Sequence, residues 1–567
     1  MKDHWFFKYL LEEKWSYLQA ILASVFINMF SIITGLYIMV VYNRILPNAS
    51  FGPSAFYTLT AIVIGVGSII VVDYIFKVLR AYFLDKSGSA MEKKSSNDVF
   101  NKIVAYDMAK APKTSGTIVS IVKEYETFRE FFNSASLLAF ADLPFTFLFI
   151  LVIYLVGGPL AYIPMIVVPT VIIFSLVLQP FMKQMADQSL TNTIAKNSVL
   201  TEMVVGLETV KTISGGDVLR ERWMESVEQQ SETNVGTRFM SQLATNFSAM
   251  AVLASQLAVV AYGVVLVSNG SLSMGALIAT MILSGRTLQP LGQLSGLLGR
   301  LNSALSAYKV VSQFMNETSQ EEKSTHFFSR NEIKGHIKFK EVEFSYPDSE
   351  EKVLNNVSLN FRSGEKVAIL GKVGCGKTTL LKLILGLHHC SSGSVMIDGA
   401  NVQQLRADDM RKNIGVVLQN PYLFSGTLRE NIGFGLDVVS DEEILEAAKI
   451  SCCLDFINKL QNGFDYYLSE NGRELSGGQR QGITLARAIV RKPQILLLDE
   501  PTSSMDQSTE KLVIDNLNTY FSDQTVILVT HRMSLLKMVD RVIAIDEGKV
   551  TVDGNKDDIV AKLKGLT

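Results

Sequence analysis

The chain has 567 residues, of which 48% are hydrophobic and 19% are charged, with a formal net charge of −2 and a pI of about 6.4. This balance, without a strongly basic patch, excludes a general nucleic-acid-binding protein. The mean hydropathy of +0.24 is high for a soluble protein, and the apolar excess lies in the N-terminal half. All four cysteines lie in the C-terminal half without metal-ligand spacing or a disulfide framework, so we expect reduced cytosolic thiols.

Residues 1–16 mix aromatic with charged side chains and lack the small-residue cleavage site of a signal peptide. Trp5, Phe6 and Tyr9 alternate with Lys8 and Glu12, which predicts a short helix lying in the membrane interface. The apolar segment that follows can direct membrane insertion by itself.

Six apolar stretches are long enough to cross a bilayer, which takes about 20 residues. They cover residues 17–41, 55–78, 137–156, 161–178, 248–267 and 274–291, the last being interrupted by Ser284, Gly285 and Arg286. Ten Lys or Arg residues lie between 77 and 136 and six between 179 and 245, whereas the short connections carry only Arg44. We therefore predict a membrane domain of six helices over residues 17–301, with both long connections and both termini in the cytoplasm.

The two long connections are rich in helix-forming residues and continue the flanking spans without a break. We expect the helices to project into the cytoplasm and to turn at 111–116, where Pro112 and Gly116 break the helix, and at 206–216. These two tips would contact the soluble domain.

Charged positions within the spans need partners, because an ionisable group in a bilayer is costly unless it faces a cavity or an opposite charge. Asp73 and Lys77 have the spacing of a local ion pair on a helix. Asp142 lies beside Pro144 near the start of the third span, where a role in a transport pathway and a role as a structural cap both stay open.

The polar segment 302–333 predicts a linker, and residues 334–567 predict an α/β domain that opens with strand-like alternation at 336–344. An apolar run at 366–370 leads into Gly-Lys-Val-Gly-Cys-Gly-Lys-Thr-Thr at 371–379 and then into an apolar helix. This order is typical of a phosphate-binding loop, whose backbone N–H groups surround an anion at a helix N-terminus. Lys377 would reach the β- and γ-phosphates of a nucleotide, and Thr378 would ligate Mg²⁺. The expected nucleotide ligands are Gly371, Gly374, Cys375, Gly376, Lys377, Thr378 and Thr379.

An aliphatic run at 495–498 ends in Asp499 and Glu500. It predicts a buried parallel strand with two acids at its carboxyl end, where ligands bind in α/β sheets. Downstream of a phosphate loop, we expect Asp499 to hold Mg²⁺ through its shell and Glu500 to act as the general base for the attacking water.

The segment Leu-Ser-Gly-Gly-Gln at 475–479, followed directly by Arg-Gln-Gly-Ile-Thr-Leu-Ala-Arg-Ala, resembles the signature of ATP-binding-cassette ATPases. By this resemblance Tyr346 stacks on adenine, Gln419 senses Mg²⁺ and contacts the membrane domain, and His531 touches the γ-phosphate. Residues 503–506, with Ser-Met where Ala-Leu is usual, resemble the loop joining two subunits, and residues 470–472 resemble the segment by which exporters contact their coupling loops.

In the family that this domain resembles, the signature of one chain completes the ATP site of a second copy. The signature residues here are Ser476, Gly477, Gly478 and Gln479. One such domain and six spans therefore imply a homodimer with two sites for ATP and Mg²⁺.

Segments 40–47, 141–145, 206–210 and 274–286 resemble the type I protein-secretion exporters, the group of haemolysin and large-adhesin transporters, although Asn43 stands where that group usually has Asp. The resemblance implies an ATP-driven exporter in a bacterial inner membrane, whose cargo is an unfolded polypeptide with an uncleaved C-terminal signal. A periplasmic adaptor, an outer-membrane channel and membrane lipids would be further partners.

Many members of this group carry an additional N-terminal peptidase-like domain. The first span begins near Tyr17 and the first cysteine is Cys375, so we expect neither that domain nor its catalytic thiol. Two other functions stay open: a lipid or drug exporter, which shares every ATPase motif, and an ATP-gated channel or regulatory membrane protein. Intact Glu500 and His531 argue against the latter, because pumping needs hydrolysis and a gated channel does not.

Overall fold

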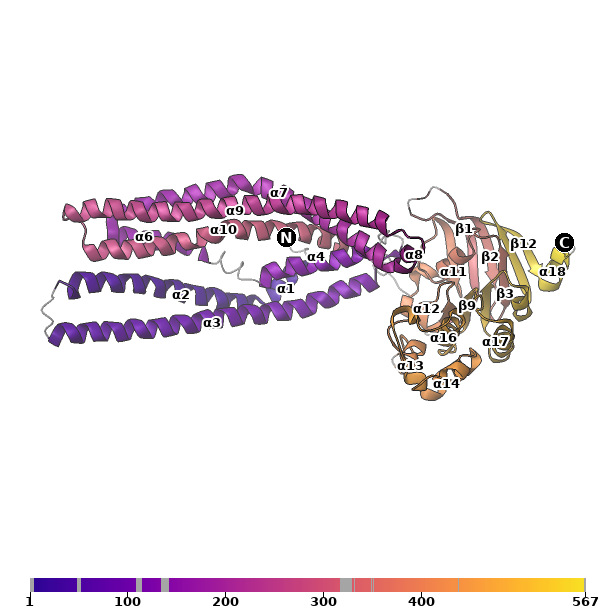
Figure 1. The fold of residues 1–567 in the computed structure, drawn as a ribbon. Coiled ribbons are helices and arrows are strands. Elements are labelled where there is room, and N and C mark those ends of the chain that lie inside the picture. Colours follow the sequence, from indigo (N-terminus) through magenta and orange to yellow (C-terminus); the bar gives the residue numbers. More distant parts are fainter. Residues whose placement is uncertain are drawn as a thin grey trace. The chain divides into compact units, whose positions relative to one another are not determined.

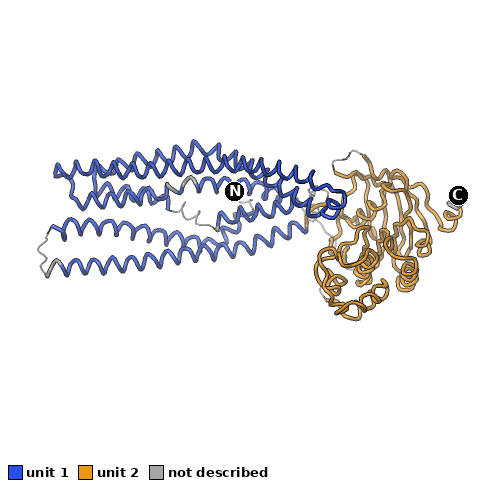
Figure 2. The backbone as a smooth tube through the Cα atoms, in the orientation of Figure 1, with its two compact units in different colours: residues 1–104, 112–317 blue, residues 105–111, 318–567 orange. Residues whose placement is uncertain are grey.

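The computed structural model describes residues 5–47, 53–108, 115–133, 142–316, 329–330, 332–347, 349, 351–436 and 438–564. The chain divides into a first unit of residues 1–104 and 112–317 and a second unit of residues 105–111 and 318–567, blue and orange in Figure 2. The first unit is helical and the second combines helices with sheets (Figure 1). The predicted fold class, a helical membrane domain followed by an α/β domain, is confirmed.

The first unit is built from long helices. In chain order they are α1 (Trp5–Glu12), α2 (Lys14–Val40), the π-helical turn η1 (Val41–Ile45), α3 (Pro53–Val104), α4 (Ser115–Asn133), α6 (Phe145–Gly157), the 3₁₀ turn η3 (Gly158–Ala161), α7 (Tyr162–Val205), α8 (Leu207–Thr212), α9 (Gly216–Ser268) and α10 (Met274–Asn316). With 52, 44 and 53 residues, α3, α7 and α9 each exceed a bilayer span by far, as the sequence predicts.

Among the described residues, four helical stretches are long and apolar enough to cross a membrane: Lys14–Ile45, Phe56–Val104, Phe145–Val205 and Gly216–Ser268. The third stretch contains two predicted spans, α6 and α7. The predicted sixth span lies on α10, which is not among the four, in keeping with the polar residues that interrupt it at 284–286.

The predicted tips differ in what the structure describes. At 206–216 the expected break is present, because α7 ends at Val205 and the short α8 precedes α9. Of the tip at 111–116, residues 111–114 lie outside the described residues.

The N-terminal helix forms, but its aromatic residues do not all face outward. Phe6 and Tyr9 are 1% and 6% exposed and pack among aromatic residues such as Phe128 of α4, while Trp15 is 67% exposed. The Tyr9 hydroxyl donates to Asp98 on α3. The expectation of an interfacial helix is therefore wrong for Phe6 and Tyr9, because their rings fill the core between α3, α4 and α10.

The predicted linker also needs correction. Helix α10 continues to Asn316, so residues 302–316 are helical. Ala304, Ala307, Val311 and Phe314 are all buried, and their spacing of three or four residues is the period of a helix face within a stretch that reads as polar.

Both charged positions in the spans have partners. Lys77 Nζ lies 2.6 Å from Asp73 Oδ2, which confirms the local ion pair. Asp142 Oδ2 lies 3.2 Å from Arg80 Nη1, and Asn28 Nδ2 donates to Asp142 Oδ1 at 3.2 Å. The carboxylate thus connects α2 and α3 to the start of the third span, which favours the structural role over the pathway role.

The described residues of the second unit form three sheets, with strand orders β2-β1-β4-β5, β12-β11-β3-β10-β9-β6 and β7-β8. The strands are β1 (Ile337–Phe344), β2 (Leu354–Phe361), β3 (Lys366–Gly371), β4 (Ser392–Ile397), β5 (Ala400–Asn401), β6 (Ile414–Val417), β7 (Gly426–Thr427), β8 (Tyr467–Leu468), β9 (Ile495–Asp499), β10 (Thr525–Val529), β11 (Arg541–Asp546) and β12 (Lys549–Asn555). The helices are α11 (Lys377–Ile384), α12 (Ala407–Asn413), α13 (Leu428–Ile432), α14 (Asp441–Ile450), α15 (Leu454–Ile457), α16 (Gly477–Ile489), α17 (Gln507–Tyr520) and α18 (Lys556–Lys564), with 3₁₀ turns η4 (Val402–Gln404), η5 (Gly463–Asp465), η6 (Glu470–Gly472) and η7 (Met533–Met538).

The centre of the six-stranded sheet, strands β9 and β10, is buried on both faces. Every residue of β9 and β10 is buried, and their side chains alternate between two cores: Leu496 and Leu528 lie in one, Leu497 and Ile527 in the other. Strands covered on both faces require such continuous aliphatic runs, and for this reason β9 can be predicted from the sequence.

Candidate functional site

The parallel strands of the central sheet end at one edge and bring the predicted site residues together. Strands β3, β10, β9 and β6 are neighbours and run parallel. They lead respectively into the phosphate loop, His531, the acids at 499–500, and Gln419. Gln419 is exposed, and no hydrogen bond among the described residues joins it to the others.

The loop between β3 and α11 has the backbone that the sequence predicts. Gly374 and Gly376 have φ angles of 86° and 101°, in the left-handed region that favours glycine. Lys377 Nζ donates to the carbonyl oxygens of Gly371 and Lys372 at 2.8 and 2.7 Å, so its ammonium is held against the loop at the N-terminus of α11. The arrangement is suited to a polyphosphate.

Thr378 and Asp499 meet although 121 positions separate them in the sequence. Thr378 Oγ1 donates to Asp499 Oδ2 at 2.7 Å. The pKa of the Asp499 carboxyl group is raised above its usual value, mainly because the group is buried. The Thr378 hydrogen bond lowers this pKa, and the charge of Glu500 raises it further. These oxygens fit Mg²⁺, a hard cation that would offset the cost of burying the carboxylate. No cluster of three or more His, Cys, Asp or Glu residues that could hold a metal ion occurs in the described part of the chain.

Glu500 and His531 form the second close pair. His531 Nδ1 lies 2.8 Å from Glu500 Oε1, and their side chains are 66% and 19% exposed. Glu500 has a φ of 50°, a conformation that few non-glycine residues adopt, and its N–H donates to Val529 O at 2.9 Å. Such strain persists where the surrounding structure holds the residue, often at a functional site.

The Tyr346 ring is held from several sides. Its hydroxyl lies 3.1 Å from Thr379 Oγ1, and its ring meets the rings of Phe344 and His388 edge-on, with centroids 5.0 and 5.4 Å apart. Lys382 Nζ lies 5.8 Å from its centroid. Burial lowers the pKa of His388, which favours the neutral imidazole. Neither His388 nor Lys382 is predicted from the sequence, because neither belongs to a motif.

The signature segment forms a capped helix N-terminus. The Ser476 side chain accepts from Gln479 N at 3.3 Å, and Gln479 Oε1 accepts from Ser476 N at 2.9 Å. Cβ atoms at Gly477 and Gly478 would lie 3.0 and 2.9 Å from atoms of Ser504, so glycine allows this close approach. Among the described residues, no hydrogen bond joins 476–479 to 371–379.

Gln481, in the first turns of α16, is a further residue that the sequence does not single out. Its Nε2 donates to Ser503 Oγ at 2.7 Å and to Glu500 O at 3.3 Å, and its Oε1 accepts from Ser504 N at 2.9 Å. The side chain, 2% exposed, therefore connects the signature helix to Glu500 at the end of β9 and to the segment 503–506.

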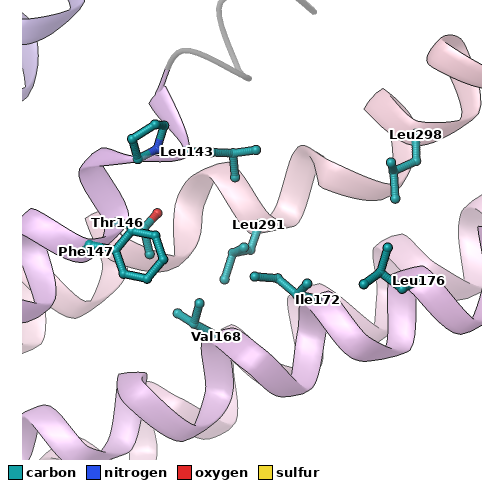
Figure 3. Close-up of a pocket in the computed structure, with 9 residues that line it drawn as sticks. Leu143, Thr146, Phe147, Val168, Ile172, Leu176, Leu291 and Leu298 are labelled. Carbon is teal, nitrogen blue, oxygen red and sulfur yellow. The ribbon is translucent and has the colours of Figure 1, made fainter.

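A cavity of about 340 Å³ lies in the first unit between α6, α7 and α10 (Figure 3). Its lining is Leu143, Pro144, Phe147, Val168, Ile172, Leu176, Leu291 and Leu298, with Thr146 as the single polar lining residue. This composition suits an apolar ligand.

Both halves of the chain are similar to known proteins. Residues 20–291 match the family model described as ABC transporter transmembrane region, and residues 354–503 match that described as ABC transporter. Leukotoxin translocation ATP-binding protein LktB of Mannheimia haemolytica is 29% identical over 99% of this chain and 78% of its own length. Leukotoxin export ATP-binding protein LtxB of Aggregatibacter actinomycetemcomitans is 28% identical over 99% of this chain and 79% of its own length.

A solved structure, described as a bacterial Atm1-family ABC exporter with ATP bound, superposes with a TM-score of 0.85 over 96% of both chains at 20% sequence identity. At this identity the likeness shows a shared fold.

Proposed function

Because this chain is an ABC exporter half-transporter, a multi-pass membrane protein that couples ATP hydrolysis to transport, we propose that it is the inner-membrane exporter of a type I secretion system. Its cargo would be an unfolded polypeptide with an uncleaved C-terminal signal. The observation that carries this proposal is the similarity to leukotoxin exporters over 99% of the chain, which includes the membrane half where exporters differ in cargo.

We propose a role for each site residue. The loop 371–379 and Lys377 would hold the phosphates of ATP, and Tyr346 would stack on adenine. Thr378, Asp499 and Gln419 would hold Mg²⁺, which when bound neutralises charge on the phosphates. Glu500 would take the proton of the attacking water. His531 would orient the Glu500 carboxylate and touch the γ-phosphate.

Half-transporters of this kind typically dimerise, and we propose a homodimer. Each ATP would lie between 371–379 of one copy and 476–479 of the other. The supporting observation is that the signature forms a capped helix N-terminus without a hydrogen bond to its own phosphate loop among the described residues. A periplasmic adaptor and an outer-membrane channel would complete the assembly. The basic residues between 77 and 136 and between 179 and 245 support a cytoplasmic location of the ATPase domain and both termini.

The ATPase rate should rise when a C-terminal fragment of the cargo is added to the purified full-length chain, and it should respond less to lipids or hydrophobic drugs. The physical reason is that the true cargo would bind the closed dimer, which hydrolyses ATP, more tightly than the open one, and its binding would therefore increase the closed population. Mass spectrometry of the secreted product should find an intact C-terminus and no leader removal. The same fragment with its sequence scrambled is the control.

The apolar cavity of Figure 3 favours one alternative, a lipid or drug exporter. ATPase activity stimulated by lipids or drugs, without a response to any cargo fragment, would establish that alternative instead.

Cysteines introduced at Thr209 and Glu470 should crosslink with reagents of suitable length, and the yield should change when ATP is added. Thr209 lies on α8 at the turn between α7 and α9, and Glu470 begins η6 just before the signature segment. The two single-cysteine variants are the controls. If no reagent crosslinks the pair in any nucleotide state, α8 does not transmit the closure through this segment.

A further inference from the structure

A buried carboxylate, that of Glu510, is bonded to both loops of the candidate site. Glu510 lies in the first turn of α17, is 5% exposed and accepts hydrogen bonds from three side chains. Thr502 Oγ1 donates at 2.8 Å, and Arg532 and Ser534 are the other two donors. Burial by itself raises the pKa of Glu510, but these hydrogen bonds lower it by more, so the pKa lies below its usual value. The buried side chain is therefore a stable carboxylate with its partners in place.

The partners of Glu510 come from the two loops that carry the proposed catalytic pair. Thr502 lies in the loop after β9, which begins with Glu500, and Arg532 directly follows His531 in the loop after β10. Arg532 also donates from Nη2 to Ser503 O at 2.7 Å. Ser503 N in turn donates to Glu500 O at 3.2 Å. One ion pair thus joins the backbone next to His531 to the turn that begins at Glu500.

The His531 ring has few hydrogen bonds of its own. The side chain is 66% exposed, and Glu500 Oε1, 2.8 Å from Nδ1, is the one hydrogen-bond partner of the ring in the part of the chain that the structure describes. An exposed side chain that is held at a single point follows the backbone that carries it. The distance between the imidazole and the carboxylate therefore depends on the spacing of the two loops, and the bonds of Glu510 and Arg532 fix that spacing.

We infer that Glu510 and Arg532 are positioning residues for ATP hydrolysis, which keep His531 at hydrogen-bond distance from Glu500. The inference rests on the proposed roles of Glu500 and His531, and it adds the ion pair that maintains their geometry. Among the described residues, no hydrogen bond joins Glu510 or Arg532 to the phosphate loop at 371–379. Loss of the pair should therefore slow the chemical step and leave ATP binding unchanged.

A second ion pair of the same domain provides the matched control. Arg541 Nη1 lies 3.0 Å from Glu365 Oε1, and the two side chains are 21% and 20% exposed. Arg541 begins β11, and Glu365 directly precedes the parallel strand β3. Both residues thus lie where these strands start, whereas the phosphate loop follows the end of β3. Substitutions there remove an arginine–glutamate pair without touching the loops that carry Glu500 and His531.

The test measures kcat and KM for ATP of the full-length chain in lipid nanodiscs. Glu510→Gln and Arg532→Gln should each lower kcat at least about tenfold, because a displacement of about 1 Å at a reacting group can cost up to about a hundredfold. KM should stay within about twofold of its original value, since binding of ATP does not involve the pair. The control variants Glu365→Gln and Arg541→Gln should keep both constants.

Thermal unfolding, measured on the same preparations, identifies a variant that does not fold. If Glu510→Gln is unfolded, Arg532→Gln decides the question, because the Arg532 side chain is 30% exposed and its loss leaves a smaller defect in the core. An unchanged kcat in the folded variants would overturn the inference. A rise in KM without a fall in kcat, or an equal loss in the control variants, would overturn it as well.

A double substitution distinguishes positioning from a general loss of structure. His531→Ala removes the group that the pair is inferred to position. Adding Arg532→Gln to His531→Ala should therefore lower the residual turnover by less than about twofold, because the two changes act on one interaction. If the two effects multiply instead, Arg532 acts through another group and the inference is wrong.

His531→Ala by itself separates this inference from the proposed function. If this variant hydrolyses ATP at the normal rate, the proposed role of His531 is wrong and the inference fails with it. If His531→Ala is impaired and Arg532→Gln is not, the role of His531 stands and only the inference is removed. The exporter proposal is tested separately, by the response of the unmodified chain to a cargo fragment.

Discussion

Replacing Glu500 with glutamine should lower ATP turnover at least about a hundredfold, the contribution of one general base, while ATP still binds. The amide keeps the size of the carboxylate beside His531 but cannot accept the proton of the attacking water. Because the phosphate loop and the Thr378–Asp499 pair are untouched, the variant should hold ATP and lock the proposed dimer in its closed state. Phosphate release and ATP binding, measured on the same preparation, separate the two effects.

Glu547→Gln is a suitable control for this variant. Glu547 is also a glutamate with a left-handed backbone, its φ being 45°, and it lies exposed between β11 and β12. The Glu547→Gln variant should hydrolyse ATP at the rate of the unmodified chain. Near-normal turnover in Glu500→Gln would mean that another group activates the water, and the assignment of the general base would be wrong.

Alkylation of Cys375 with a maleimide should abolish ATP binding, and ATP added first should protect the chain. Cys375 is 6% exposed within the phosphate loop, and its Sγ lies 3.8 Å from Lys377 Nζ. An adduct cannot fit into so close a packing without displacing the loop that surrounds the phosphates. The measurement is ATP binding after labelling, with the modified residue identified by mass spectrometry.

The other thiols provide the internal comparison. Burial raises the pKa of Cys390 and Cys452, and it raises the pKa of Cys453 to about 12, so fewer thiolates are available for reaction at these positions. Cys375→Ser should therefore keep its ATP binding after the same treatment. Equal sensitivity in Cys375→Ser would assign the effect to another cysteine.

The sequence predicts the geometry of the candidate site, because phosphate chemistry restricts residue types at fixed places in a fold. Glycines at positive φ, a lysine at a helix N-terminus, and acids after a strand buried on both faces can each be recognised without knowledge of their neighbours. The parallel order of β3, β10, β9 and β6 then brings Thr378 to Asp499 and His531 to Glu500.

Residues that act through packing cannot be predicted in this way. His388 and Gln481 carry no local pattern, and their roles follow from which rings and loops happen to surround them. Asp142 acquires its partner Arg80 from a helix 62 residues earlier in the chain. The burial of Phe6 likewise depends on a pocket formed by three other helices, so its sequence context alone favours the membrane.

The hydrogen bonds of Gln481 would couple the binding of two nucleotides. In the homodimer that we propose, the start of α16 belongs to the ATP held by the partner copy, whereas Glu500 belongs to the ATP held by the same copy. One buried amide thus touches the supports of both nucleotides. ATP binding at one site should then change the affinity of the other site for ATP. Because such coupling is reciprocal for binding, the two sites should bind ATP cooperatively rather than independently.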